Sequence, residues 1–146
     1  MNVKAAGAAD DAVKVLDSWA VLAWLRNEPA GAAMDRLLAM ARAGRLRLAI
    51  SAINLGEAFY IVARWRSEKD AELFLSEFQT LPVDIRSVPK ALVFEAARLK
   101  GTHRLSYADA FAVATAVREK AVLVTGDPEM KALESQGIVK LVWIRS

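Results

Sequence analysis

Short apolar runs alternate with longer segments of helical character along almost the whole chain, and this order restricts the folds that it can adopt. Five runs of four to eight residues are rich in Val, Leu and Ile and are predicted to be strands. The segments between them repeat apolar residues every three or four positions, as amphipathic helices do. Strands separated by helices pair in parallel, so the sequence predicts an α/β fold with a central parallel sheet flanked by helices on both faces. The predicted strands are 13–16, 46–50, 81–88, 121–124 and 138–144.

Capping residues and helix breakers indicate where the helices begin and end. Ser18 and Ser51 each precede an apolar helical segment, where a hydroxyl can accept a free backbone N–H. Gly44 is typical of a position just beyond the end of a helix. The predicted helices are 19–25, 30–43, 52–65, 67–80, 89–100, 106–119 and 128–135.

Two packing details follow from the same pattern. In the helix 67–80 we expect Leu73, Phe74 and Phe78 to face inward. The run 81–88 contains Pro82 and two charged residues, which favours a strand at an edge of the sheet.

The length and composition fit a single domain. Of the 146 residues, 55% are hydrophobic, which is enough to bury a core. Charged residues interrupt every apolar run well short of the roughly 18 residues of a membrane span. Residues 1–12 are rich in Ala but carry Asp10 and Asp11 where a signal peptide needs an apolar core. We therefore expect a disordered leader over 1–12, one domain over 13–146 and a cytoplasmic location, which the absence of cysteine also fits.

Four acidic residues stand at the first turn or inner face of predicted helices, and three of them come just after a predicted strand. They are Asp17, Glu57, Asp109 and Asp127. The carboxyl ends of parallel strands meet at one edge of a sheet, where ligands of such folds bind. The sequence therefore predicts that these four carboxylates lie close together.

Three of the four also have a simple structural interpretation. Asp17 and Asp127 stand where a carboxylate caps a helix, and Pro128 suits the first helical position. Asp109 lies three residues after Ser106, which is the spacing of a capping box. For each residue alone, capping is a sufficient explanation.

Glu57 is harder to explain as a structural residue. In a helix over 52–65 it shares a face with Ile53, Tyr60, Ile61 and Arg64. We expect that face to be buried, and an unpaired carboxylate there is costly or stays protonated. Glu57 therefore needs a partner, which can be the Arg64 guanidinium or a metal ion.

Gathered carboxylates favour a hard divalent cation. Two carboxylates about 4–5 Å apart repel by roughly 3–4 kcal/mol at an effective dielectric near 20. Mg²⁺ or Mn²⁺, which prefer oxygen ligands, relieves that repulsion, whereas zinc is disfavoured because the chain has no Cys and one His. The net charge is +3, and without the four acids 20 basic residues face 13 acidic ones. Such a surface suits a polyanionic substrate, although a surface tuned for solubility gives the same excess.

The motifs that are absent narrow the chemistry. The chain has no Gly-x-Gly-x-x-Gly, Walker loop or Gly-x-Ser-x-Gly. His103 is the sole histidine, and a lone loop histidine is more often a surface residue than a base. Carboxylate-bound metals that act without a protein nucleophile are typical of phosphodiester hydrolysis, in which they activate water and stabilise the departing oxygen.

Four short motifs resemble the signatures of PIN-domain ribonucleases, in the order and spacing of the VapC-type toxins of toxin–antitoxin pairs. The likeness extends over about 13–144. The motifs are Leu16-Asp17-Ser18, Asn54-x-x-Glu57, Leu105-Ser-x-Ala-Asp109-Ala110 and Thr125-x-Asp127. Met130 stands where many relatives have Phe, which concerns packing more than chemistry.

This resemblance implies a PIN-like domain that cleaves RNA with Mg²⁺ or Mn²⁺, forms a homodimer and is neutralised by a cognate antitoxin. It also implies that Asp17, Glu57, Asp109 and Asp127 bind the metal and act in catalysis. Asp127 matches the most variable of these positions. Thr125 and Ser18 would support the acids through hydrogen bonds.

Other residues fit a substrate or partner surface. Arg104 and His103 precede the Asp109 helix and could contact RNA phosphate, although exposed loop charges are the simpler interpretation. Trp24 and Trp65 lie on predicted helices that also carry arginines, which leaves core packing and a partner surface as alternatives.

Two rival functions remain at this point. A phosphatase of the haloacid-dehalogenase type also begins with an Asp after its first strand, but it needs a second Asp two residues later, where this chain has Trp19. A non-catalytic PIN-fold protein that binds RNA or a partner would use the same acids as caps. Metal-dependent thermal stabilisation distinguishes this second rival from a nuclease.

Overall fold

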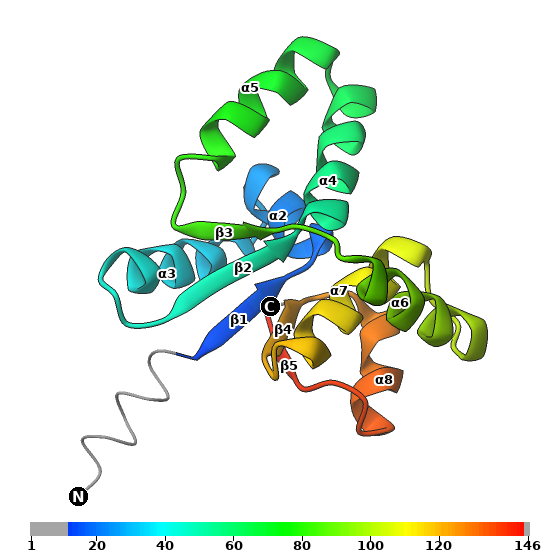
Figure 1. The fold of residues 1–146 in the computed structure, drawn as a ribbon. Helices are drawn as coiled ribbons and strands as arrows, with labels where there is room; N and C mark the ends of the chain where they lie inside the picture. Colours follow the sequence, from blue (N-terminus) through cyan, green and yellow to red (C-terminus); the bar gives the residue numbers. More distant parts are fainter. Residues whose placement is uncertain (1–11, 145–146) are drawn as a thin grey trace, which may run out of the picture.

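Five parallel strands form one sheet in the order β3-β2-β1-β4-β5 in the computed structural model, which describes residues 12–144. The predicted parallel α/β fold is thereby confirmed (Figure 1). Of the expected leader, residues 1–11 lie outside the described residues. The strands are β1 (Val13–Leu16), β2 (Arg47–Ser51), β3 (Val83–Arg86), β4 (Val122–Thr125) and β5 (Leu141–Trp143).

Helices cover both faces of this sheet. No helix among residues 12–144 is long and apolar enough to cross a membrane. Figure 1 shows α4 and α5 as a pair that projects from the sheet, whereas α6, α7 and α8 gather on the other side. The helices are α2 (Ser18–Leu25), α3 (Gly31–Arg42), α4 (Ala52–Trp65), α5 (Glu68–Phe78), α6 (Lys90–Thr102), α7 (Tyr107–Arg118), the 3₁₀ turn η1 (Pro128–Met130) and α8 (Lys131–Ser135).

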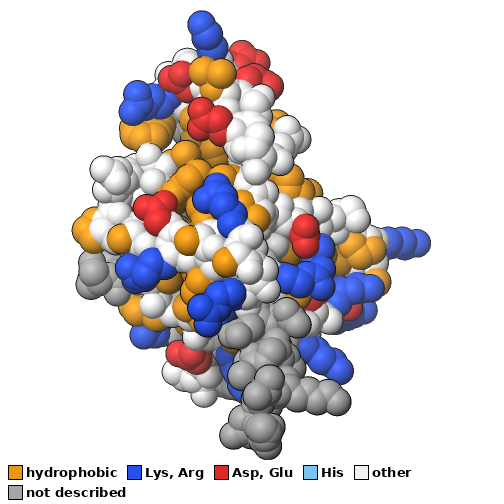
Figure 2. Space-filling view, turned by 90° about the vertical axis from the view of Figure 1, so that its left-hand side faces the viewer, with side chains coloured by type: hydrophobic (Ala, Val, Ile, Leu, Met, Phe, Trp, Pro, Cys, Tyr) orange, Lys and Arg blue, Asp and Glu red, His pale blue; other side chains and the backbone are white. Residues whose placement is uncertain are grey.

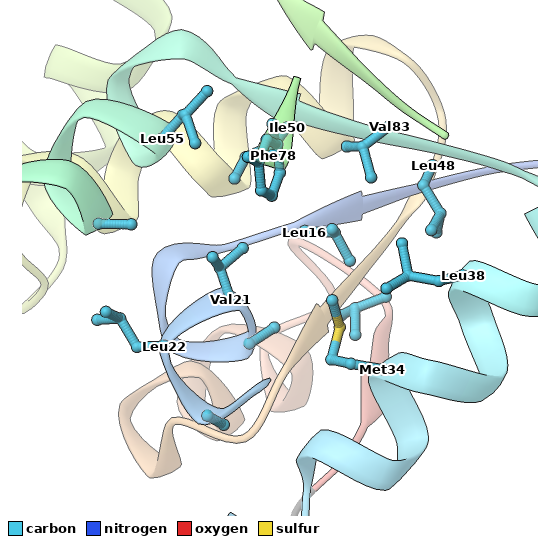
Figure 3. Close-up of a cluster of buried hydrophobic side chains, with 14 of the residues drawn as sticks. Leu16, Val21, Leu22, Met34, Leu38, Leu48, Ile50, Leu55, Phe78 and Val83 are labelled. Atoms are coloured by element: carbon cyan, nitrogen blue, oxygen red, sulfur yellow. The ribbon is translucent and has the colours of Figure 1, made fainter. Parts of the chain in front are cut away.

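Two hydrophobic clusters lie on opposite faces of the sheet because side chains alternate along each strand. Leu16 and Val124 join the cluster under α2 to α5, and their neighbours Val15 and Leu123 join the cluster under α6 to α8. Figure 3 shows the first cluster, in which side chains from β1, β2 and β3 meet those of α2, α3, α4 and α5. The strands β1, β2 and β4 are thus largely buried on both faces, which explains their mostly apolar sequences.

The topology decides where the ends of the strands emerge. β1 lies at the centre of the sheet, between β2 and β4, and Leu16 pairs with both Ile50 and Val124. The residues that follow β1 and β4 therefore leave the sheet at the same edge and on neighbouring strands. Asp17 and Asp127 come after these two strands, which confirms that both follow inner strands.

Most of the predicted helix boundaries are confirmed, with one correction at the start of α2. The Ser51 and Ser106 hydroxyls cap α4 and α7 as expected. Gly44, just after α3, has a positive φ of 74°. Ser18, however, is the first residue of α2 and does not cap it. The cap is Asp17, which directly follows β1 and whose carboxylate accepts the Ala20 N–H.

The helix α5 corrects a second expectation. Phe74 and Phe78 are buried, as predicted, but Leu73 is 53% exposed. Residues one position apart on a helix diverge by about 100°, so the stripe through Phe74 and Phe78 turns Leu73 away from the core. The strand β3 lies at an edge of the sheet, as its charged residues predicted. Its Arg86 forms two hydrogen bonds of 2.9 Å with Glu119, just after α7.

Candidate metal centre

Asp17 is a buried carboxylate with one oxygen in use and one without a partner. It is only 1% exposed, since it lies between the central strand and α2. Its Oδ1 accepts the Ala20 N–H at 2.9 Å and so caps α2. Its Oδ2 has no hydrogen-bond partner among the residues that the structure describes. A buried oxygen of this kind is costly unless a cation or a proton occupies it.

Asp109 lies in the first turn of α7, a helix whose middle part is buried. The Ser106 hydroxyl accepts the Asp109 N–H at 3.1 Å and fixes the start of this helix. The seven residues Ala110–Ala116 are all buried. Asp109 itself is half-buried, and its carboxylate lies at the N-terminal end of this helix.

Asp127 follows β4 and is held by two local hydrogen bonds. Its N–H donates to the Thr125 hydroxyl at 3.1 Å, and its Oδ1 accepts the Glu129 N–H at 3.0 Å. Asp109, Asp127 and Glu129 each offer a carboxylate oxygen, and these oxygens lie within 4.8 Å of one another. The fold therefore brings acids from two separate segments together at a spacing that one cation can bridge.

Glu57 lies on a face of α4 that is less buried than we expected from the sequence. The helix buries Asn54, Leu55, Ala58 and Val62 instead, and Tyr60 on the Glu57 face is 46% exposed. The expected burial of that face is therefore wrong, because α4 turns its neighbouring stripe toward the core. Arg64 forms no ion pair with Glu57 in the described part of the chain. The partner of Glu57 is Ser18, whose hydroxyl donates to Oε1.

The electrostatics of the centre show that these acids interact. Burial raises the pKa of Asp17 from 3.8 to about 7, with contributions from the charges of Asp109 and Asp127. The Thr125 hydroxyl and the Ala20 N–H lower the pKa of Asp17 and so offset part of this increase. Oδ2 itself accepts no hydrogen bond within residues 12–144. Burial likewise raises the pKa of Asp109 to about 6.

The charges that add to the raised pKa of Asp109 are those of Asp127, Glu57 and Glu129, while Ser106 opposes it. Asp109 therefore interacts electrostatically with each of the other three acids predicted from the sequence, and with Glu129 as well. Without a cation, Asp17 and Asp109 hold protons more tightly than isolated carboxylates do.

Sequence reasoning gave no role to two residues of this centre, although Asn54 stands in one of the four motifs. Asn54 is fully buried, its Nδ2 donates to the Ala108 carbonyl at 2.9 Å, and its Oδ1 has no partner among the described residues. It thus joins α4 to the first turn of α7. Its signal was a polar residue on the buried face of α4, three positions before Glu57. Glu129 was also given no role, and the signal that could have indicated one was its position two residues after Asp127.

His103 and Arg104 lie apart from this hydrogen-bond network. The His103 ring is half-buried and contacts the Leu99 carbonyl and the Gln136 side chain. Arg104 is exposed, and within residues 12–144 it makes no hydrogen bond or ion pair. Their suggested contact with RNA stays a prediction.

The donor set fits a hard divalent cation. Carboxylate oxygens from two parts of the chain converge, and the unpartnered Asp17 Oδ2 belongs to the same electrostatic cluster. Mg²⁺ and Mn²⁺ prefer such oxygen ligands and retain waters at the remaining positions. The chain contains no cysteine, so a thiolate site is excluded.

Comparison with solved structures shows the same fold in several other proteins. A chain of VapBC2 from Rickettsia felis, solved with a promoter DNA fragment, has 20% identity and a TM-score of 0.69, covering 91% of this chain and 99% of its own. VapC20 of Mycobacterium tuberculosis, described as a toxin that cleaves the sarcin–ricin loop, has 18% identity and a TM-score of 0.65, covering 82% and 93%. PAE2754 of Pyrobaculum aerophilum has 22% identity and a TM-score of 0.61, covering 90% and 92%.

No curated protein sequence gives a significant match. A family model described as the PIN domain, however, matches residues 14–135, which include all four predicted acids. This match confirms the resemblance seen in the four motifs and decides against the haloacid-dehalogenase alternative. Met130, which stands where many relatives have Phe, is buried in the second hydrophobic cluster. The chain belongs to the PIN domain family.

Proposed function

We propose that this protein is a Mg²⁺- or Mn²⁺-dependent endoribonuclease and the toxin of a type II toxin–antitoxin pair. The observation that carries the proposal is the buried Asp17 Oδ2, which has no partner in the described structure and interacts electrostatically with Asp109 and Asp127. A capping role explains Oδ1 and leaves Oδ2 unexplained. Asp17, Glu57, Asp109 and Asp127 are the proposed metal-binding and catalytic acids, and Glu129 is placed beside two of them.

A divalent ion bound by these acids would supply a nucleophilic water at neutral pH and neutralise charge on the scissile phosphate. The chain's own residues keep the acids in place. Ser18 holds Glu57 through a hydrogen bond, and Thr125 holds the backbone of Asp127. Asn54 connects the helices that carry Glu57 and Asp109. Such supporting hydrogen bonds orient ligands before a metal or substrate binds.

The partners follow from the same proposal. Several of the structural neighbours were solved as toxin–antitoxin complexes. For this chain we propose RNA as the substrate, a cognate antitoxin protein as the inhibitor, a homodimer as the active form and a cytoplasmic location. The described surface offers large exposed apolar side chains, among them Leu73, Phe94 and Val117, that a protein partner can cover.

The decisive experiment incubates purified protein with end-labelled total RNA in Mg²⁺ or Mn²⁺, beside an EDTA control. Asp109→Asn removes a proposed ligand with little change in shape, and Glu72→Gln, on the exposed side of α5, is the matched control for charge. We expect discrete fragments from the parent and from Glu72→Gln, and none from Asp109→Asn or in EDTA.

Intact RNA with every metal, from folded protein free of antitoxin, would instead favour a non-catalytic PIN-fold protein that binds RNA or a partner. Thermal unfolding with Mn²⁺ provides a separate measure, because a ligand that binds only the folded state raises the melting temperature according to its occupancy. A metal-dependent rise in the parent but not in Asp109→Asn identifies the metal site even without cleavage.

A further inference from the structure

The metal-centre face of α4 carries an exposed aromatic residue and an arginine beyond Glu57. Tyr60 and Arg64 follow Glu57 by three and seven residues, so all three lie on one side of the helix. At 1.5 Å per residue they stand about 5 and 10 Å further along the helix axis. Tyr60 is 46% exposed, and the Arg64 guanidinium lies 5.1 Å from the centre of its ring.

Core packing does not account for this pair. Tyr60 belongs to neither hydrophobic cluster, whereas its neighbours Phe59 and Ile61 pack against the first one. Arg64 forms no ion pair or hydrogen bond within residues 12–144, and its recorded contact is with the Tyr60 ring. The Tyr60 ring and the Arg64 guanidinium, with its five N–H donors, are therefore presented to solvent on the same face of α4 as Glu57.

A second exposed tyrosine begins α7. Tyr107 is the first residue of that helix, two positions before Asp109, and is 44% exposed. Its ring packs on Phe111 at 4.9 Å between centroids, which fixes its orientation. The chain has only two tyrosines, and they lie on the two helices that supply Glu57 and Asp109. The hydrogen bond from Asn54 to the Ala108 carbonyl joins these helices next to Tyr107.

This chemistry fits single-stranded nucleic acid. Exposed aromatic rings stack nucleobases of any sequence, and unpaired guanidinium groups bind phosphate. Basic charge is also needed to hold a polyanion next to several carboxylates, because those carboxylates repel phosphate. Figure 2 shows one face of the molecule, on which Lys and Arg side chains lie among apolar, acidic and other side chains, and the net charge of +3 adds to the attraction at longer range.

The nearby Trp65 is less suited to this role. It is 47% exposed and stacks with Arg26 and Arg66. The groove that Trp65 lines, however, also contains Asp70 and Glu77, which oppose a phosphate backbone. The Tyr60 and Arg64 pair continues the face of Glu57 and is therefore the better site.

Building on the proposed function, we propose that Tyr60 and Arg64, with Tyr107, form an RNA-binding rim beside the metal centre. Tyr60 and Tyr107 stack bases of a single strand on either side of the scissile phosphate. Arg64 binds a phosphate next to the base on Tyr60. The rim selects unpaired RNA over duplex, since only unstacked bases can reach the rings.

The test measures binding of a fluorescein-labelled single-stranded RNA of about 12 nucleotides to the full chain carrying Asp109→Asn, which prevents cleavage. We expect Tyr60→Ala to weaken binding by about 5- to 50-fold, and Tyr60→Phe, which keeps the ring, to stay within about twofold of the parent. Arg64→Gln should weaken binding by about fivefold and flatten the salt dependence by about 0.7 in the log–log slope. Arg36→Gln, on the exposed side of α3, is the control for loss of charge.

Unfolding temperatures of Tyr60→Ala and Arg64→Gln made in the chain that retains Asp109, with and without Mn²⁺, show whether each variant keeps its fold and metal site. RNA affinity unchanged by Tyr60→Ala and Arg64→Gln, in a protein whose parent cleaves RNA, overturns the rim and leaves the nuclease intact. A parent that neither binds nor cleaves RNA overturns both proposals. Loss of antitoxin binding in Tyr60→Ala, with RNA affinity unchanged, assigns this face to a protein partner and overturns the RNA assignment.

Discussion

At Asp17 a single carboxylate combines a structural and a proposed chemical role. One oxygen caps α2, and the other is buried without a partner. Asp127 shows the same division, since its Oδ1 caps the turn η1 while the residue faces Asp109 and Glu129. Capping and metal binding therefore do not compete, because a carboxylate has two oxygens. A capping role for Asp17 and Asp127 therefore does not argue against metal binding by the same residues.

The raised pKa of Asp17 leads to a prediction about stability. In metal-free protein at pH 8, folding must keep this carboxylate charged in an apolar environment. Asp17→Asn removes the charge and retains a good helix cap. We expect it to increase the free energy of unfolding by on the order of 2 kcal/mol in EDTA, and to abolish the rise in melting temperature with Mn²⁺. Urea unfolding in EDTA measures the free energy, and thermal unfolding with and without MnCl₂ measures the melting temperature. A variant less stable than the parent in EDTA would contradict this account.

At the scale of elements, α4 connects the core to the site. Its buried stripe packs on the sheet and α5, whereas the adjacent stripe carries Glu57 toward the acids. Asn54 lies at the boundary between these stripes and bonds to the backbone of α7. The relative position of Glu57 and Asp109 therefore depends on one side-chain hydrogen bond between two helices.

Asn54→Ala should separate this link from general stability. It removes the hydrogen bond from the buried Asn54 side chain to the half-buried Ala108 carbonyl, which lowers the free energy of unfolding by about 1–3 kcal/mol. We also expect Mn²⁺ affinity, measured by calorimetry, to fall about tenfold because the start of α7 loses its anchor. Ser51→Ala removes the cap of α4, the helix that carries Asn54, and lowers the free energy of unfolding by about 1 kcal/mol. If this control weakened Mn²⁺ binding equally, a specific role for Asn54 would be ruled out.

The edge strand β3 is joined to the far end of α7 by Arg86 and Glu119. Their side chains are 31% and 23% exposed and form two hydrogen bonds of 2.9 Å. A double-mutant cycle with Arg86→Gln and Glu119→Gln should give a coupling energy of about 1–2 kcal/mol. The pair Arg118 and Glu95 is more exposed and 3.5 Å apart, so the same cycle there should give less than about 0.5 kcal/mol. Equal couplings would show that burial and geometry have no influence here.

At the scale of the whole molecule, the clustering of acids makes stability depend on pH. The pKa values of Asp17 and Asp109 rise from 3.8 to about 7 and about 6, so the folded protein binds protons more tightly than the unfolded chain. Their contribution to stability is therefore fully present below pH 4 and is lost as the pH rises to about 7. Metal binding requires the charged forms and acts in the opposite direction.

We accordingly expect the melting temperature in EDTA to fall between pH 5 and pH 8, and the increase caused by Mn²⁺ to grow over the same range. Differential scanning fluorimetry across this range measures both trends. The double variant Asp17→Asn and Asp109→Asn is the control for all other titrating groups and should have a flatter profile. A parent profile as flat as that of the variant would mean that these two acids are not perturbed.

The sequence by itself determined the elements and their order, and it led to the four acids that are proposed to bind metal. Hydrophobic periodicity and capping residues are local signals, and so they predicted the parallel sheet, the edge position of β3 and most helix boundaries. The four motifs likewise identified the family before any geometry was known.

Only the tertiary structure decided which faces and atoms meet. It turned the Glu57 face of α4 toward the acids instead of the core and exposed Leu73. It also brought Glu129 beside Asp109 and placed Asn54 against the backbone of α7. The physical reason is that these relations depend on how elements far apart in the chain pack against one another. The rotation of a packed helix and the pairing of a side chain with a distant backbone group are set by that packing, and local sequence patterns do not record it.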